Sequence, residues 1–299
     1  TENAETINNI RINDFGPAKQ FYNQTQSIRQ YYSFNDVDND RYMINGTYTQ
    51  TYLATREIDE TKIGDSWLNR HLKYTHGYGV TISRVNQVTG SGQPDVVVGN
   101  IPPESSVEGL EITRPEIYFG ELSNEYIVVG TDETEFDYPS GDSNQYTQYE
   151  GTAGINMNLF NRLVFAINER SFKLLVSSNI DSDSKIIIHR NVMDRIRTIM
   201  PYLSYENDPY MVTVDGKLYW MVDAYTTSTN YPYAQPSDEY GTNYIRNSIK
   251  VVVDAYNGDV DFYVVDGEDP IAQTYTKIYP KLFKSFDEMP EGLKADIRY

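Results

Sequence analysis

The sequence predicts an α+β fold in which antiparallel sheets, built from hairpins, pack against amphipathic helices. The main observation is a pair of consecutive hairpins in the second half of the chain. Residues 210–225 contain an Asp-Gly pair at 215–216, and residues 249–265 contain an Asn-Gly pair at 257–258. Each pair lies between runs rich in valine and aromatic residues. Because these dipeptides adopt positive φ in two-residue turns, they are the strongest local signal for a tight antiparallel hairpin.

The first elements of the chain fit this class. Pro17 suits the first turn of a helix. Side chains that would share one face of this helix recur at intervals of four, three and four residues: Phe21, Thr25, Ile28 and Tyr32. This spacing predicts an amphipathic helix of about four turns. An aspartate-rich segment at 36–40 ends the helix, and an Asn-Gly pair at 45–46 predicts a hairpin over residues 41–55.

The middle of the chain is predicted to contain short strands. Residues 67–74 suit a short helix. Residues 80–88 are predicted to form a strand that returns through a glycine-containing loop into a second strand at 94–98. Residues 116–129 are predicted to form two short strands around a glycine.

Two further helices are predicted before the hairpins of the second half. Residues 159–167 have helical apolar spacing, and an apolar stripe over 188–199 ends at Pro201. Both halves therefore contain the same elements in the same order: a helix, an aromatic and acidic segment, a tyrosine and a hairpin. We predict an internal duplication, with related helix-plus-sheet subdomains at 1–150 and 151–299. The alternative is that an α+β chain reaches this order by chance.

The composition excludes several functions. The 25 basic and 43 acidic residues give a formal charge of −18, which would repel a nucleic-acid backbone, so no nucleic-acid partner is expected. The absence of cysteine removes disulfides, thiolate catalysis and cysteine-based zinc sites. No apolar run reaches the roughly 18 residues of a membrane span, so residues 1–299 are expected to be soluble. The chain begins at Thr1 without a leader, which suggests processing or a piece of a longer protein.

Three alternating aspartates, Asp36, Asp38 and Asp40, are candidate ligands for calcium. A hard cation is bound by several converging carboxylate oxygens. An EF-hand is excluded, because Arg41 stands where its loop needs glycine and Thr47 where it needs a bidentate glutamate. The alternative is an aspartate-rich turn that caps the preceding helix and pairs with Arg41. No cofactor is expected otherwise, and calcium at this cluster remains open.

Histidine offers little for catalysis. His71 and His76 are five residues apart, whereas a helical zinc-binding pair is spaced by four, and His189 is the remaining histidine. We keep His76 as a candidate ligand; the alternative is a hydrogen-bonded polar role beside the glycines that follow it. A serine nucleophile at 90–92 is disfavoured, because the Gly-Ser-Gly there lacks the strand-to-helix elbow of a hydrolase.

Acidic residues near aromatic ones form the densest candidate set: Glu116, Glu121, Glu135, Asp137, Glu150, Asp223 and Asp254. Glycoside hydrolysis needs two carboxylates at a suitable separation, flanked by rings that stack on sugars. The alternative is that these acidic residues only solvate the surface, as most do. Four of them are retained as ligand candidates: Glu116, Glu121, Asp223 and Asp254. Asp223 and Asp254 stand out because they are charged residues in strands whose pattern predicts burial.

Blocks of sequence from residue 9 to the end of the chain resemble the bacterial uncharacterised protein family 0182 (UPF series). They include Trp67-Leu-Asn, Asp208-Pro-Tyr210 and Val253-Asp-Ala-Tyr-Asn-Gly258. The other blocks lie at 9–11, 26–42, 74–79, 114–121, 135–139, 149–151, 219–226 and 243–248. Their shared order makes the resemblance more specific than any one motif. The sequence departs from the family at Asn39, where an apolar residue is usual.

The resemblance implies a large multi-pass bacterial membrane protein whose later part lies outside the cytoplasmic membrane. This chain would then be anchored at the outer face of the cell membrane, with its own transmembrane region upstream as a partner. We expect a non-enzymatic extracytoplasmic domain that binds or senses a cell-envelope glycan or protein, or has a structural role there. The alternative is an envelope glycan or peptide hydrolase with paired carboxylates. The resemblance supplies no catalytic residue.

Overall fold

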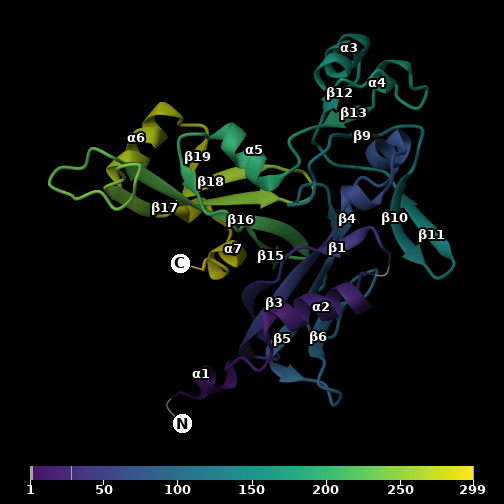
Figure 1. Ribbon diagram of the computed structural model, residues 1–299. Helices are drawn as coiled ribbons and strands as arrows, with labels where there is room; N and C mark the ends of the chain where they lie inside the picture. The colour runs from purple at the N-terminus through teal and green to yellow at the C-terminus, as the bar shows by residue number, and fades with distance from the viewer. Residues whose placement is uncertain (1–2, 28, 299) are drawn as a thin grey trace.

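The computed structural model describes residues 3–27 and 29–298. It confirms the α+β class: antiparallel sheets with helices packed against them make up the fold (Figure 1). Within those two ranges, none of the helices has the length and hydropathy needed to span a bilayer.

The first sheet is formed by residues 32–105. Its strands are β1 (Tyr32–Phe34), β2 (Asp38–Ile44), β3 (Thr47–Ile58), β5 (Val80–Val88), β6 (Pro94–Gly99) and β7 (Glu104–Ser105). They lie in the order β1-β3-β5-β6-β7, with β2 also paired to β3, and every pair is antiparallel. Helix α1 (Ala4–Asn8) precedes α2 (Phe15–Thr25), which covers this sheet by packing Tyr22 against Phe34 and Tyr52.

The second sheet is formed by residues 204–285. Its strands are β14 (Ser204–Tyr205), β15 (Tyr210–Val214), β16 (Lys217–Ser228), β17 (Tyr244–Asp254), β18 (Val260–Val264) and β19 (Phe283–Ser285). Their order is β14-β16-β17-β18-β19, with β15 paired to β16, and only the β18–β19 pair among these is parallel. The helices around it are α5 (Val192–Ile199), α6 (Pro270–Ile278), η3 (Phe286–Glu288) and α7 (Glu291–Ala295).

The two sheets have the same strand order, but the last pair is antiparallel in the first sheet and parallel in the second. In each, a short strand and the first hairpin strand pair with one long strand, and the following strands add outward from it. The equivalent strands β2 and β15 also meet: the backbone N–H of Met211 donates to Asp38 at 3.1 Å, and that of Thr213 donates to the Tyr42 hydroxyl at 3.3 Å. A duplication would produce this likeness, but the duplication and its boundaries stay predictions.

A middle segment of short elements lies at the upper right of Figure 1. It comprises η1 (Glu60–Lys62), η2 (Asn69–Lys73), β4 (Gly77–Tyr78), β8 (Glu116–Ile117), β9 (Ile127–Val129), β10 (Glu135–Ser140), β11 (Ser143–Thr147), β12 (Ile155–Asn156), α3 (Leu159–Asn168), α4 (Lys173–Val176) and β13 (Lys185–Ile187). Strand β4 pairs with β8, β10 with β11, and β13 with both β9 and β12. α3 and α4 form the projecting end of this segment.

Arg190 connects several parts of the middle segment to one another through its side chain. Its side chain is 4% exposed and follows β13. The guanidinium donates to three backbone carbonyls, those of Tyr118 at 2.8 Å, Glu125 at 3.1 Å and Thr75. It also lies 3.5 Å from a carboxylate oxygen of Glu60. One buried cation therefore joins the segments around η1, η2, β8 and β9.

The principal hydrophobic core draws on both sheets and on α5. Leu53 and Ile82 of the first sheet belong to the same buried cluster as Trp220 and Val251 of the second. Trp220 is fully buried, and its indole N–H donates to the Phe119 carbonyl at 2.9 Å. Satisfying this N–H removes the penalty of burying a polar group inside the core.

Two of the three predicted turns are confirmed as tight hairpins. Asn45 and Gly46, between β2 and β3, have φ of 50° and 76°, and the Asp215-Gly216 turn between β15 and β16 is equally left-handed. The third connection, from β17 to β18, is longer than a two-residue turn and covers 255–259. It is longer because the Asp254 carboxylate accepts from the backbone N–H groups of the two residues beyond Ala255 and so folds a wider turn.

Two helix boundaries differ from the sequence predictions. α2 ends at Thr25, and Tyr32 belongs to β1 because that strand pairs with the end of β3; Ile28, also assigned to the helix, lies outside the described residues. α5 excludes Ile188 because the Asn191 side chain caps the helix, accepting from the backbone N–H groups of the next turn.

Candidate functional site

Two of the predicted acidic residues, Glu116 and Asp254, line a single pocket of about 240 Å³. It lies where β8 and the segment at 150–152 meet the beginning of β16 and the end of β17. The residues around it are Arg114, Glu116, Glu150, Gly151, Thr152, Lys217, Leu218, Asp254, Tyr256 and Asn257. Cations and carboxylates thus converge on one small space, which is the arrangement expected of a polar binding site.

Among the described residues that line this pocket, Glu116 is the one whose carboxylate has an unsatisfied hydrogen-bond acceptor. Its Oε2 atom is buried and has no hydrogen-bond partner among the residues that the structure describes. Its Oε1 atom lies 3.9 Å from the Arg114 guanidinium. Burial raises the pKa of Glu116; Arg114 opposes this rise, and the nearby Glu150 carboxylate adds to it.

Asp137 extends this acidic environment beyond the pocket. Its pKa is raised to about 7, first by burial and then by the charges of Glu116 and Glu135. Its Oδ1 atom is buried and also lacks a hydrogen-bond donor within the described part of the chain. Like charges close together in a buried place favour a positively charged ligand over an anionic one.

Tyr256 forms part of the wall but does not offer a free ring face. The Arg114 guanidinium carbon lies 4.5 Å from its ring centroid, and the rings of Tyr118 and Tyr149 pack at 5.3 and 5.0 Å. Its hydroxyl accepts from the Glu150 backbone N–H at 3.0 Å, and the residue is 9% exposed. Sugar-binding sites need an accessible aromatic face, and this one is already covered.

Asp254 shapes the rim of the pocket. Its Oδ1 atom accepts from the backbone N–H groups of Tyr256 at 2.7 Å and Asn257 at 2.9 Å. Asn257 in turn accepts from the Tyr149 hydroxyl and the Thr152 backbone N–H, both at 3.0 Å. The charge in this strand therefore has a structural use, which is to hold the turn that borders the pocket.

Asp38 and Asp40 point to the same side of β2 and are buried at the seam between the two sheets. Asp38 accepts from the Arg298 guanidinium at 3.1 Å as well as from Met211, and burial raises its pKa to about 7. Asp40 accepts from the Tyr42 hydroxyl and from the Arg41 backbone N–H at 2.8 Å. Their oxygens are therefore occupied by protein donors.

Asp36 and Glu121 belong to a second acidic group. Asp36 lies against Asp208, whose pKa is raised by burial and then by the hydrogen bond and the charge of Asp36. The pKa of Glu121 is raised to about 8 by burial and then by the charge of Glu57, and Asn35 donates to it at 3.5 Å. Over residues 3–27 and 29–298, no three carboxylate or histidine side chains are arranged to hold a metal ion. Calcium at 36–40 stays a prediction.

His76 and Asp223 do not line the pocket at Glu116. The His76 ring is buried 4.8 Å from the ring of Tyr118, its Nδ1 atom is 2.9 Å from the Gly77 carbonyl, and burial lowers its pKa to about 4. Asp223 of β16 faces Lys250 of β17 across the sheet, with an ion pair of 2.7 Å. The ion pair satisfies Asp223, whereas the Nε2 atom of His76 is buried without a hydrogen-bond partner among the described residues.

The comparisons with known proteins identify the family. The model of the Uncharacterised protein family (UPF0182) matches residues 1–299. The chain belongs to this family. A UPF0182 protein of Alkaliphilus metalliredigens is 54% identical over 300 residues, covering 99% of this chain and 32% of the relative. UPF0182 proteins of Clostridium botulinum and Clostridium perfringens are each 51% identical. No solved structure matches the chain.

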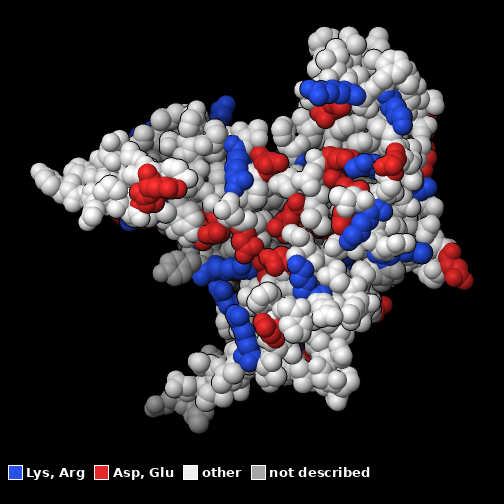
Figure 2. Space-filling model, in the orientation of Figure 1, with Lys and Arg blue, Asp and Glu red and all other residues white. Residues whose placement is uncertain are grey.

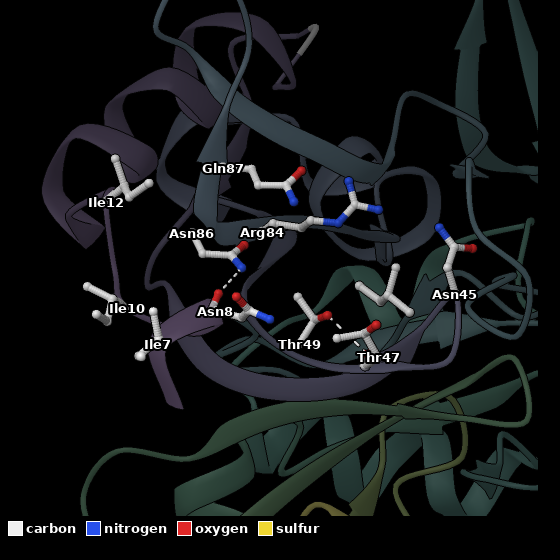
Figure 3. A pocket seen from close by; sticks show the side chains of 11 residues that line it. Ile7, Asn8, Ile10, Ile12, Asn45, Thr47, Thr49, Arg84, Asn86 and Gln87 are labelled. Atoms are coloured by element: carbon white, nitrogen blue, oxygen red, sulfur yellow. Dashed lines mark hydrogen bonds between the residues drawn. The ribbon is translucent and has the colours of Figure 1, made fainter. Parts of the chain in front are cut away.

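This UPF0182 chain spans about a third of the length of those relatives. It also contains a larger cavity of about 780 Å³ at the edge of the first sheet, beside α1. Figure 3 shows polar side chains of β3 and β5 on one side and Ile7, Ile10 and Ile12 on the other. Of its lining residues only Arg84 is charged, and Asp95 pairs with it. The pocket at Glu116 therefore remains the better candidate for chemistry.

Sequence reasoning missed Arg114 and Lys217 as members of the candidate site. Arg114 lies two residues before Glu116, so an extended backbone places both side chains on one face, and this signal was present. Lys217 follows the Asp-Gly turn and is brought in only by the tertiary fold.

Proposed function

We propose that this chain is an extracytoplasmic domain of a longer bacterial membrane protein, and that it binds or senses a cell-envelope component without catalysing a reaction. The support is the family membership, the acidic composition and the length of the relatives. Its first partner is then the membrane-embedded part of the same protein. A membrane-impermeant reagent applied to intact cells tests the location: residues of this chain are expected to be labelled, and labelling only after lysis contradicts it.

The ligand proposed for the pocket is a small molecule with an ammonium group, such as a basic peptide side chain of the envelope. The observation that carries this proposal is that the carboxylates of Glu116, Glu150 and Asp254 line one pocket. An ammonium donates three hydrogen bonds and carries the charge that Glu116 and Glu150 favour. The net charge of −18 also raises the local concentration of cations.

Binding is expected to strengthen as the pH rises through the pKa of Glu116. Burial raises the pKa of this carboxyl in the free protein, so it takes up a proton at a higher pH than an exposed glutamate does. A cation binds the ionised form, and binding therefore releases a proton. Calorimetry in two buffers of different ionisation enthalpy would detect that release.

Lysine is a suitable probe, with its Nε-acetylated form as the matched ligand that lacks the side-chain charge. Glu116→Gln is expected to weaken amine binding by more than tenfold, because a buried charge partner is lost. Glu108→Gln alters an exposed carboxylate outside the pocket and is expected to bind like the wild type. Equal affinity for the free and acetylated forms would exclude an ammonium site.

The alternative proposal is a glycan or peptide hydrolase. It is favoured by one observation: Glu116, with a raised pKa, and Glu150 line the same pocket, as a general acid and its partner would. The covered ring of Tyr256 argues against a sugar substrate. Incubation with cell-wall fragments decides between the two, because a hydrolase would release products in a reaction abolished by Glu150→Gln, whereas the binding domain leaves the fragments intact.

A further inference from the structure

α3 exposes its apolar face to solvent, whereas a helix packed on a globular core buries that face. Its exposed stripe is apolar and consists of Leu159, Phe160, Leu163, Val164 and Ile167. Leu159, Phe160 and Ile167 are 81%, 72% and 70% exposed. The opposite face carries Arg162, whose guanidinium donates to four backbone carbonyls of α4 and the loop after it. The charge is thus directed inward and the apolar side chains outward.

The neighbouring α4 enlarges the same surface. Phe172 and Val176 lie four residues apart at its ends and are 71% and 61% exposed. In Figure 1 the two helices form the end of the projection, far from both labelled termini, and Figure 2 shows the outermost atoms there uncoloured. Contiguous apolar surface of this kind on a soluble fold marks an interaction site.

The charge and composition of the projection distinguish a lipid surface from a protein partner. Residues 155–180 contain three basic residues and one acidic residue, a charge of +2 in a chain of −18. The exposed members, Arg170 and Lys173, suit anionic lipid headgroups. Protein interfaces are enriched in tyrosine and tryptophan, yet residues 150–201 contain neither, although the chain has 27 tyrosines. Leucine, isoleucine and phenylalanine beside basic residues are typical of helices that lie in a bilayer interface.

We propose that the α3–α4 projection inserts its apolar stripe into the headgroup region of an anionic lipid bilayer. The acidic remainder of the chain would be repelled by such a surface, but salt of about 0.1 M screens charges more than about 10 Å away. The projection therefore contacts the membrane in addition to the membrane-embedded part of the same protein, a part whose presence rests on the proposed function.

Flotation of the 299-residue protein with vesicles tests this inference. The wild type is expected to float with phosphatidylcholine vesicles that contain about a third phosphatidylglycerol, and less with phosphatidylcholine alone. The double variant Phe160→Ser with Ile167→Ser is expected to bind at least about tenfold more weakly. The control is Tyr233→Ser with Tyr240→Ser, two aromatic residues of the 229–243 loop that are more exposed than Phe160 and Ile167, and it should float like the wild type.

A spectroscopic variant reports the depth of insertion. Phe160→Trp is expected to gain a blue-shifted emission with vesicles and to be quenched by brominated lipid, relative to the two native tryptophans of the wild type. The proposal is overturned if the wild type does not float, or if the serine variant floats as well as the wild type. If the wild type instead self-associates without lipid and the serine variant does not, the surface is a contact between copies of the chain, which also overturns it.

Discussion

Replacing Arg190 with methionine is expected to destabilise the fold by about 3–5 kcal/mol. Methionine fills similar volume, so the loss comes mainly from polar groups left behind. The carbonyls of Tyr118, Glu125 and Thr75 would lose their donor in a buried place, and Glu60 would lose its nearby cation. Urea denaturation of both proteins measures the difference in the free energy of unfolding.

Two further variants separate this effect from the loss of charge alone. Arg197→Met removes an arginine that is exposed on α5 and bonded to Asn207, and it is expected to cost less than about 1 kcal/mol. Arg190→Lys keeps the charge but cannot reach three carbonyls with a planar fork, so an intermediate loss is expected. If Arg190→Met were no more destabilising than Arg197→Met, the hydrogen bonds of Arg190 would not stabilise the middle segment.

The free energy of unfolding is expected to be at least about 3 kcal/mol larger near pH 5.5 than near pH 8. Five carboxyl groups have pKa values raised mainly by burial: Asp38, Glu57 and Asp137 to about 7, and Glu121 and Asp296 to about 8. Between about pH 4 and these values the folded protein holds protons that the unfolded chain has released. Stability therefore falls as the pH rises through this range.

Groups whose pKa is lowered in the fold oppose this trend on the acid side, and His76 and Asp269 are examples. Between about pH 4 and 6.5 the unfolded chain protonates His76, whose pKa is lowered to about 4 by burial in the fold, so its contribution grows with pH. Burial alone would raise the pKa of Asp269, but hydrogen bonds from Ser248, Thr226 and Tyr244 outweigh it and lower the pKa. That contribution is lost as the pH falls below about 4, which limits the rise in stability on the acid side.

Denaturation across this pH range, with two glutamine variants, measures the effect. Glu121→Gln is expected to reduce the fall in the free energy of unfolding between pH 5.5 and 8. It is also expected to raise the stability at pH 8, because it removes one of the buried charges. Glu268→Gln changes an exposed glutamate and should leave the profile unchanged. A wild-type profile that rises from pH 5.5 to 8 would show that these carboxyls are ionised in the folded protein.

Local sequence signals predicted the sheets well, because their hairpins depend on neighbouring residues. The Asn45-Gly46 and Asp215-Gly216 turns fix the register of the long strands β3 and β16 without help from distant segments. The pocket at Glu116 was less accessible to prediction. It combines residues from about 114 to 257, and no local pattern indicates which turns will meet.

The periodicity of apolar residues also could not predict which face of a helix is buried. The spacing of Leu159, Leu163 and Ile167 correctly predicted α3. It carried the usual expectation that the apolar side is buried, but in the fold these three residues are exposed and Ala166 is buried. Arg162 decides the orientation, because its hydrogen bonds to the α4 region can form only if that side faces inward.

The contact between Asp38 and Arg298 joins residues that are 260 positions apart. Arg41, also on β2, donates to the carbonyls of Ala295 and Ile297. During synthesis at about 5–20 residues per second, β2 therefore waits on the order of 10 to 50 seconds for these partners. Until then Asp38 lacks its cation, and the first sheet has an incomplete edge. Folding of the two sheets should accordingly be completed together, late, and after the last strand has been made.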